Sequence, residues 1–428
     1  MQSGFATDEP ISHGAGIMLT HVLPVRSLLL AIFMIMAGSG FLSTLIAIRL
    51  EQDGASAITI GIVATAYFAG LIAGSLRVPR LLARVGHIRS FAAFVTLFSA
   101  SSLTYALTLY APMWVALRFV DGFVMSGVFV CLESWLNKKA SPASRSAILA
   151  SYMVVLYSGQ AGGQFLLNLA DNSPSLPFML SAILLSLATL PVVLTYMDQP
   201  EQEPLAPFSA RKLYQASPLG IVGTVATGAM LGAFYALGAV YVSRTGMDVA
   251  LVALFTFVVI AGGVALQWPL GLLSDRVDRR KVILGCFAGV VALSAGMYLV
   301  AGNSAATIVL GGLFGGFAFT LYPLCVAHTN DHLEDDHRVG ASGGLVLAYS
   351  VGAVAGPLTG SLGMMLIGPG GLFAAIGAIA LIALGFSLWR MANSAPVPEE
   401  DQQSFRAHPR TTPMVAVLEE EDQPPETP

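Results

Sequence analysis

The sequence predicts an all-helical integral membrane protein, with twelve transmembrane helices in two six-helix, pseudo-symmetric bundles. Three observations predict this class. Hydrophobic residues make up 55% of the 428 residues and charged residues only 11%, whereas soluble domains carry roughly a quarter charged residues. Apolar stretches long enough to cross a bilayer recur along the chain, and the second half repeats the glycine and charge pattern of the first.

The apolar stretches define the expected helices in order. A hydrocarbon core of about 30 Å requires about 20 helical residues. Spans of this length are predicted at 26–49, 58–80, 90–110, 112–134, 146–170, 176–197, 218–242, 249–273, 281–301, 305–328, 340–366 and 370–391. The first stretch is too long for a signal peptide, and no small-residue cleavage pattern follows it. We therefore expect it to remain as an uncleaved span.

Basic residues give the expected orientation. Of the 21 Lys and Arg residues, only three lie outside the segments that would face the cytoplasm if both termini did: Arg49 and Arg244 in outer loops, and Arg118 within a span. Cytoplasmic loops of membrane proteins carry this excess of positive charge. We expect a multi-pass protein of a bacterial inner membrane with both termini in the cytoplasm.

Polar segments divide the chain. The segment 198–217 is polar and contains proline, and the residues after 393 are rich in Pro, Glu and Asp. Such acidic, apolar-poor composition is typical of disorder. The predicted organisation is a cytoplasmic N-terminal tail at 1–25, a bundle at 26–197, a cytoplasmic linker at 198–217, a second bundle at 218–392 and a disordered cytoplasmic tail at 393–428.

The two halves are related by an internal repeat. A shift of 192 residues places Gly40 on Gly232, Gly70 on Gly262 and Arg84-Val85 on Arg276-Val277, and a shift of 194 pairs Gly122 with Gly316 and Cys131 with Cys325. Loop charges coincide along with the glycines, which makes chance a poor explanation. Six-helix halves related in this way can enclose a cleft and expose a site near the membrane midplane to alternate sides.

Sequence motifs in both halves resemble those of a known family. Residues 271–280, from Gly271 through Asp275-Arg276 to Arg279-Arg280, resemble the G-x-x-x-D-R-x-G-R-R loop of the major facilitator superfamily, with Asp278 in place of the second glycine. The corresponding first-half loop keeps Arg84 but has Ala83 where the aspartate would stand. Residues 118–122 resemble the R-x-x-x-G element of the same superfamily.

Two further segments refine the resemblance. Gly352, Gly356, Pro357 and Gly360 in the eleventh span are similar to the glycine-proline element usually described in the fifth span of antiporters, and residues 133–137 resemble a bacterial branch without an assigned substrate. The resemblance implies the major facilitator (MFS) fold and a monomeric secondary active transporter, not an enzyme. Such a carrier would move a small organic solute through the bilayer, with protons as the expected coupling ion.

Two other functions remain open. The eroded first-half loop and the long acidic tail would also fit a non-transporting receptor or assembly factor that keeps the carrier fold. A lipid flippase would instead need a lateral opening between spans. The sequence does not decide between uptake and efflux or between symport and antiport, and it leaves the resting conformation open.

The loop after the eighth span is the candidate cytoplasmic gate. A carboxylate at a helix end can cap the positive N-terminus of another helix, and pseudo-symmetry points Asp275 toward residues 144–147. The basic residues Arg276, Arg279, Arg280 and Arg84 would brace neighbouring helix ends. Because Ala83 cannot cap, the gate would be asymmetric. The alternative is that these charges only retain the loop in the cytoplasm.

Ionisable residues within spans are the first candidates for substrate or proton binding. Arg118 and Asp121 lie three residues apart on one helical face, where Asp121 would exchange a proton beside Arg118, or the two would form a structural pair. Glu133 follows Arg118 by fifteen residues, about 22 Å along a helix. It is either a second proton carrier or, as the sequence favours, an interfacial carboxylate beside Trp135.

Polar and aromatic residues complete the candidate site. Gln160 and Gln164 share a helical face and align with Gly352 and Gly356. They would hydrogen-bond a solute, or join helices within the bilayer. The other residues expected to line the cleft, or else to pack within the bundle, are Tyr157, Tyr235, Gln267, Trp268, Phe319 and Tyr322.

Other functions find little support in the sequence. His328 and His332 have i, i+4 spacing, but no third ligand is fixed by spacing, so neither a metal site nor a cofactor is predicted. Nucleotide-binding and hydrolase motifs are missing. The three cysteines lie singly in apolar segments, which indicates packing, and no basic patch suits nucleic acid.

Overall fold

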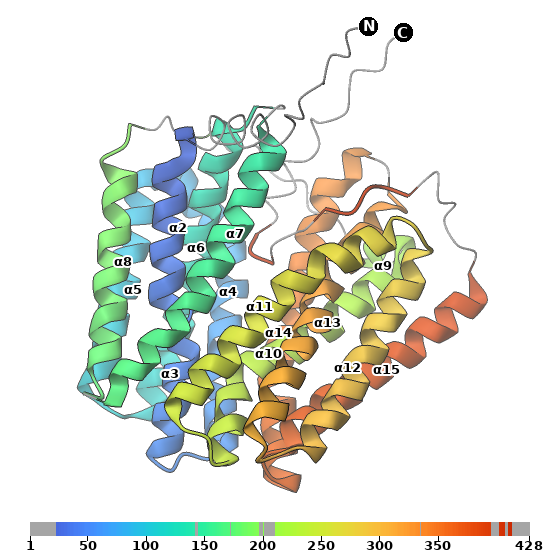
Figure 1. Ribbon diagram of the computed structural model, residues 1–428. Coiled ribbons are helices and arrows are strands. Elements are labelled where there is room, and N and C mark those ends of the chain that lie inside the picture. The colour runs from blue at the N-terminus through green and yellow to red at the C-terminus, as the bar shows by residue number, and fades with distance from the viewer. Residues whose placement is uncertain are drawn as a thin grey trace, which may run out of the picture.

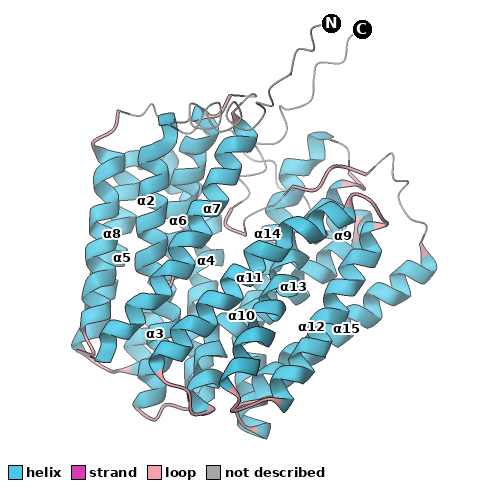
Figure 2. Ribbon diagram, in the orientation of Figure 1, coloured by secondary structure: helices cyan, strands magenta, loops and turns pink. Residues whose placement is uncertain are grey.

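The computed structural model describes residues 23–141, 144–171, 173–196, 200, 210–333, 335–394, 402–406 and 410–412. Within these residues every regular element is a helix (Figure 2). In chain order they are η1 (Leu23–Val25), α2 (Arg26–Ser39), α3 (Leu42–Gln52), α4 (Ala57–Val85), α5 (His87–Leu107), α6 (Ala111–Lys139), α7 (Arg145–Gly163), η2 (Gln164–Asp171), α8 (Leu176–Val193), α9 (Ala210–Ala216), α10 (Pro218–Arg244), α11 (Val249–Ser274), α12 (Arg279–Leu299), α13 (Ser304–Asn330), α14 (Asp335–Ile367) and α15 (Gly371–Asn393).

The helices occupy the twelve predicted positions. Ten helical segments in the described part of the chain are long and apolar enough to cross a membrane, with α2 and α3 forming the first of them. Helices α5 and α7, the latter continued by η2, occupy the two remaining positions. The predicted all-helical transmembrane fold is therefore confirmed. A short helix, α9, lies within the segment predicted to be a linker.

The helices form two groups that pack in the same pattern (Figure 1). In the first group α4 packs on α6, α2 packs on α7 and α8, and α5 packs on α8. In the second group α11 packs on α13, α10 packs on α14 and α15, and α12 packs on α15. Each contact in one group thus has a counterpart six spans later, as an internal repeat requires.

Glycines permit close helix crossings in both groups. A Cβ on Gly352 would lie 2.0 Å from the Val225 carbonyl oxygen of α10. In the first group, a Cβ on Gly159 would lie 2.7 Å from the Phe33 carbonyl oxygen of α2, and one on Gly163 would lie 2.5 Å from that of Ala37.

These crossings correct the register of the repeat. Gly159 and Gly163 play the role that Gly352 and Gly356 play in the second group, so the offset here is 193 residues. The alignment of Gln160 and Gln164 with those glycines is one residue out of register. The error arose because the sequence alignment was fixed on positions in the first two spans.

The two groups contact each other where α3 and α10 end. Arg244 donates two hydrogen bonds to the Glu51 carboxylate, each 2.7 Å long. Deeper in the bundle, the Thr65 hydroxyl of α4 donates to the Val354 carbonyl of α14 at 3.2 Å. Gly61 lies against Pro357 and Ser361 on the same pair of helices. These contacts hold the halves together at the end of the bundle remote from Asp275.

Candidate functional site

A cavity of about 160 Å³ lies between the two groups of helices. Both groups contribute side chains to it, mostly aromatic and uncharged polar ones. Its lining includes Ser43, Tyr67, Phe68, Leu71, Tyr157 and Gln160 from the first group, Tyr235 and Tyr349 from the second, and Arg410 and Thr411 from the segment after α15. The composition is that of a small-molecule site, in which a few polar groups are set among aromatic ones.

Arg118 and Asp121 form a buried pair behind one wall of this cavity. Their side chains approach to 3.8 Å, and the Tyr105 hydroxyl donates to Asp121 at 2.7 Å. Arg118 donates to the Ser43 hydroxyl at 2.7 Å, and its guanidinium carbon lies 4.3 Å from the centre of the Tyr67 ring. Ser43 and Tyr67 both line the cavity. The pair predicted from spacing is therefore present, and Ser43 and Tyr67 separate it from the cavity.

Glu133 is fully buried within the protein. Its carboxylate accepts hydrogen bonds from the Tyr152 hydroxyl at 2.6 Å and from the hydroxyls of Thr411 and Thr412. Helix α6 continues to Lys139, which places Glu133 well within the helix, and the segment 410–412 covers it. Sequence spacing located Glu133 along the helix but could not show what lies over it.

The two glutamines have different environments. Gln160 lines the cavity and donates to the Tyr235 hydroxyl of the other half at 3.4 Å. Gln164 accepts from Thr44 at 3.1 Å and donates to the Gly40 carbonyl at 3.0 Å. Gln164 thus joins η2 to the α2–α3 region, the helix-joining role considered above, whereas Gln160 faces the cavity.

The aromatic residues predicted to line the cleft also occupy different environments. Tyr235 and Tyr157 line the cavity, Phe319 lies 6.1 Å from Tyr235 between ring centres, and Tyr322 lies 5.5 Å from Tyr349. Gln267 on α11 is buried, but the cavity lining does not include it. The neighbouring side chain, Trp268, is 69% exposed and also lies outside the lining of this cavity.

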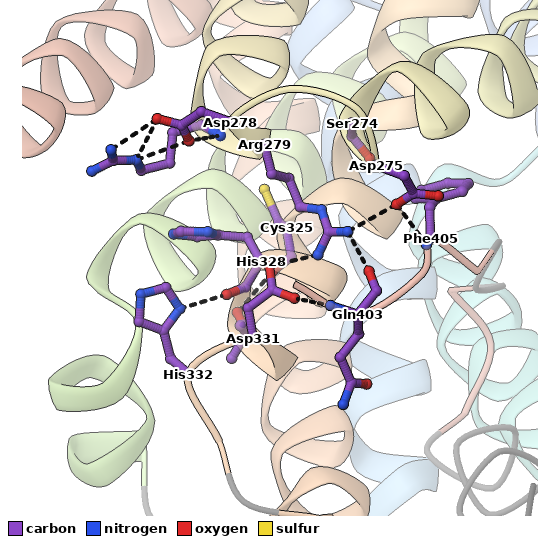
Figure 3. Close-up of polar contacts among 12 residues, drawn as sticks. Ser274, Asp275, Asp278, Arg279, Cys325, His328, Asp331, His332, Gln403 and Phe405 are labelled. Carbon is purple, nitrogen blue, oxygen red and sulfur yellow. Dashed lines mark hydrogen bonds and ion pairs between the residues drawn. The ribbon is translucent and has the colours of Figure 1, made fainter. Parts of the chain in front are cut away.

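Arg279 is the centre of the candidate gate (Figure 3). It is almost fully buried and donates to Asp331 at 2.5 Å, to Asp275 at 3.1 Å and to the Gln403 carbonyl at 2.6 Å. Asp331 also accepts from the Gln403 N–H at 3.0 Å, and Asp275 accepts from the Phe405 N–H at 2.8 Å. The loop residues therefore bind the segment 402–406, which lies along the second half.

This arrangement differs from the expected helix cap. Among the described residues, the hydrogen-bond partners of Asp275 are Arg279 and Phe405, and residues 144–147 are not included. The backbone N–H of Phe405 occupies the position at which a helix N-terminus was expected. Gly271 makes room for it, because a Cβ there would lie 2.1 Å from the Phe405 ring.

Arg280 and Asp278 form a second ion pair beside the first. Asp278 accepts from the Arg280 side chain at 2.8 Å and caps α12 by accepting from the Arg280 N–H at 3.0 Å. Burial raises the pKa of the Asp278 carboxyl, but these hydrogen bonds and the charge of Arg280 outweigh it and hold that pKa below its usual value. At Asp331, burial prevails over Arg279 and raises the pKa of the carboxyl. Arg276 and Arg84 are exposed.

The segment after α15 is the main feature that the sequence did not predict. It was expected to be disordered, yet residues 402–406 contact the gate, Arg410 and Thr411 line the cavity, and Thr412 binds Glu133. The rest of the predicted tail, and the predicted N-terminal tail, lie outside the described residues apart from Leu23–Val25 and the end of α15. No signal in the sequence indicated these contacts, because Arg410 and Thr411 have no periodic pattern and lie in a Pro- and Glu-rich segment.

His328 and His332 contact each other near the end of α13. His332 contacts the His328 carbonyl through Nδ1 at 2.8 Å, and their rings lie 4.7 Å apart. Within the part of the chain that the structure describes, no three His, Cys, Asp or Glu side chains cluster to hold a metal ion.

Comparison with known proteins identifies the family. The family described as Major Facilitator Superfamily matches residues 28–266 and 219–420. An uncharacterized MFS-type transporter, YcaD, of Shigella flexneri is 28% identical over 383 residues, covering 89% of this chain and 99% of its own. The YcaD protein of Escherichia coli O139:H28 is similar to the same degree.

Solved transporters share the fold. A mutant form of the nucleoside transporter NupG superposes with a TM-score of 0.75 at 9% identity, covering 86% of this chain and 99% of NupG. A bacterial homolog of the human lysosomal transporter Spinster, inward-facing and unoccupied, gives 0.69 at 13% identity and covers 92% and 100%. Together with the paired six-span packing, these matches show that the chain is a multi-pass membrane protein of the Major Facilitator Superfamily.

Proposed function

We propose that this chain is a secondary active transporter that moves a small organic solute across the inner membrane by alternating access, with protons as the coupling ion. The observation that carries the proposal is the cavity between the two halves. It is lined from both sides, and Gln160 and Tyr235 meet across it. A solute bound there would contact both halves, so tilting one half against the other would change the compartment to which it is exposed.

The contacts between the halves support this interpretation. The Glu51–Arg244 pair and the Thr65–Val354 hydrogen bond join them at one end of the bundle. At the other end, residues 402–406 bind the ends of α11 and α13, and residues 410–412 bind side chains of α6 and α7. By the positive charge of its loops, this second end is the cytoplasmic one, so the closed end would face outward.

Two buried carboxylates support proton coupling. Among the described residues, Asp121 and Glu133 are the fully buried acidic side chains of the membrane helices. Ionisable groups in a bilayer are costly and usually functional. One oxygen of Asp121 has no hydrogen-bond partner in the described structure, and Glu133 contacts Thr411, which lines the cavity. Either carboxyl can exchange a proton as the cavity opens to water.

The test is proton and solute flux in proteoliposomes. Candidate solutes are first selected by their ability to raise the unfolding temperature of the purified protein. With an imposed pH gradient, wild-type protein should accumulate the selected solute and move protons that a trapped pH indicator reports. Glu133→Gln and Asp121→Asn should abolish the dependence on the gradient. Asp53→Asn makes the same change from carboxylate to amide at an exposed outer-loop residue, and this variant should keep the dependence on the gradient.

Two outcomes would overturn the proposal. Flux equal to that of protein-free liposomes, for a solute that stabilises the wild-type protein, would favour the receptor alternative. Gradient-independent flux by the wild type would remove proton coupling and leave facilitated transport.

A further inference from the structure

The chain's own Arg410 places a guanidinium group in the solute cavity. Its guanidinium carbon lies 4.4 Å from the centre of the Phe319 ring and 5.7 Å from that of Tyr349. One nitrogen donates to the Tyr157 hydroxyl at 3.3 Å. These rings come from α13, α14 and α7, so both halves of the protein contribute to the cage.

The cage has the chemistry of a cation site. The face of an aromatic ring attracts a cation, and the attraction strengthens where water is excluded. Apart from Arg410 itself, the side chains that line the cavity are uncharged. Arg118, a cation within the membrane helices, lies behind Tyr67 and is paired with Asp121. A positively charged ligand would therefore meet aromatic faces, with no other positive charge in the lining to repel it.

An acidic and hydroxyl-bearing neighbourhood adjoins the cage. Thr411 and Thr412, directly after Arg410, donate their hydroxyls to Glu133, which also accepts from Tyr152. A ligand with a cationic group at one end and a hydrogen-bond donor at the other would fit both the aromatic cage and the Glu133 carboxylate. Glu133 would supply the acceptor for that donor, as it does for the hydroxyls of Thr411 and Thr412.

A second contact keeps the segment near the cavity. Residues 403 and 405 bind Asp275, Arg279 and Asp331 at the gate (Figure 3). Tethering of this kind gives a group an effective concentration of about millimolar or more at its site. Arg410 can therefore compete with a free ligand without being a tight binder.

We propose that the cavity binds a monovalent organic cation with a guanidinium or amino group and a hydrogen-bond donor, and that Arg410-Thr411-Thr412 occupies this site as a tethered competitor. This assignment rests on the proposed function, because it names the substrate class for the transport site. It extends that function by making the chain's own segment a regulator of access.

The test is equilibrium binding to the purified full-length protein, without any gradient. The probes are n-propylguanidinium, which reproduces the arginine side chain, and n-propylurea, its uncharged isostere. If Arg410 fills the site at least nine-tenths of the time, the combined variant Arg410→Ala, Thr411→Ala, Thr412→Ala should bind n-propylguanidinium at least about tenfold more tightly than the wild type. Neither protein should bind n-propylurea. Arg77→Ala, at an exposed residue of α4 outside the cavity lining, should bind as the wild type does.

Two cage variants then locate the site. On the background of the combined variant, Phe319→Leu should weaken n-propylguanidinium binding about tenfold, by loss of the ring nearest the cation. Tyr157→Phe removes one hydroxyl with little change in volume and should weaken it a few-fold, which keeps the test decisive if Phe319→Leu does not fold.

The assignment is overturned if the two probes bind equally, or if the combined variant binds n-propylguanidinium no better than the wild type. Cation binding without flux in liposomes would overturn the proposed function and leave the cation site standing. Proton-coupled flux of a neutral solute, without cation binding, would overturn the assignment alone.

Discussion

The Glu51–Arg244 ion pair should control how often the cavity opens at its closed end. The pair is bidentate, with both N–O distances 2.7 Å, and it joins the first half to the second. The side chains are 20% and 27% exposed. A buried charge-assisted contact contributes about 1.5–3 kcal/mol, and solvent screening at this exposure reduces the figure to about 1–2 kcal/mol.

Arg244→Ala should therefore raise the population that is open at this end by about five- to thirtyfold. The assay is the rate at which a membrane-impermeant thiol reagent, applied from outside to right-side-out vesicles, modifies Leu71→Cys in the cavity lining. The three native cysteines are buried and should give a low background. Arg244→Ala should speed the modification by the same factor.

The exchange variant Glu51→Arg, Arg244→Glu is the matched control, because it restores an ion pair with reversed polarity. It should return the rate toward the wild-type value. An unchanged rate in Arg244→Ala, or a rate in the exchange variant as high as in Arg244→Ala, would refute the reasoning.

Two other predictions concern helix packing and the gate. Gly228→Ala would place a methyl carbon 2.0 Å from the Tyr349 carbonyl oxygen, 1.4 Å inside the 3.4 Å of ordinary contact, and should lower unfolding stability by about 1–3 kcal/mol. Gly285→Ala on α12 meets nothing within 4 Å and should be neutral or stabilising by up to about 1 kcal/mol; equal losses in thermal unfolding would contradict the glycine argument. Asp275→Asn weakens the contacts to Arg279 and Phe405 and should change the transport rate about fivefold, for a loss of about 1 kcal/mol. A rate as unaffected as that of Asp53→Asn would show that the loop only retains charge in the cytoplasm.

The fold was predictable because the bilayer leaves few alternatives. Every backbone polar group in hydrocarbon must be satisfied within its own helix, so length and hydropathy alone located the spans to within a few residues. The second half of the pattern followed from the repeat. The register of the repeat could not be predicted, because an alignment of apolar sequences tolerates a slip of one residue. Gly159 and Gly163 therefore take the role first given to Gln160 and Gln164.

The site was predictable only where a charge stood in an apolar span. Arg118 and Asp121 were found as a pair because three residues separate them on one helix. Their contacts with Tyr105, Tyr67 and Ser43 come from other helices, and no spacing in the sequence indicates them. The sequence could not show whether Gln267 and Trp268 line the cavity, because helix α11 is apolar on every face and its inner and lipid-facing sides cannot be told apart.

The segment after α15 could not have been predicted from composition. Its role depends on Glu133 and Arg279, which lie far from it along the chain and offer hydrogen-bond partners to its backbone and hydroxyls. Composition reports whether a segment can build a core of its own. It does not report whether a cavity elsewhere will bind it.

Movement of one half against the other is tested most directly by spin-label distances at the two ends of the bundle. One pair of labels would sit at Asp53→Cys and Ala250→Cys, near the Glu51–Arg244 end, and the other at Ala83→Cys and Lys281→Cys, near the gate; all four native residues are exposed. On addition of the transported solute, alternating access predicts that one distance lengthens as the other shortens. Two distances that stay constant, or that change together, would contradict it.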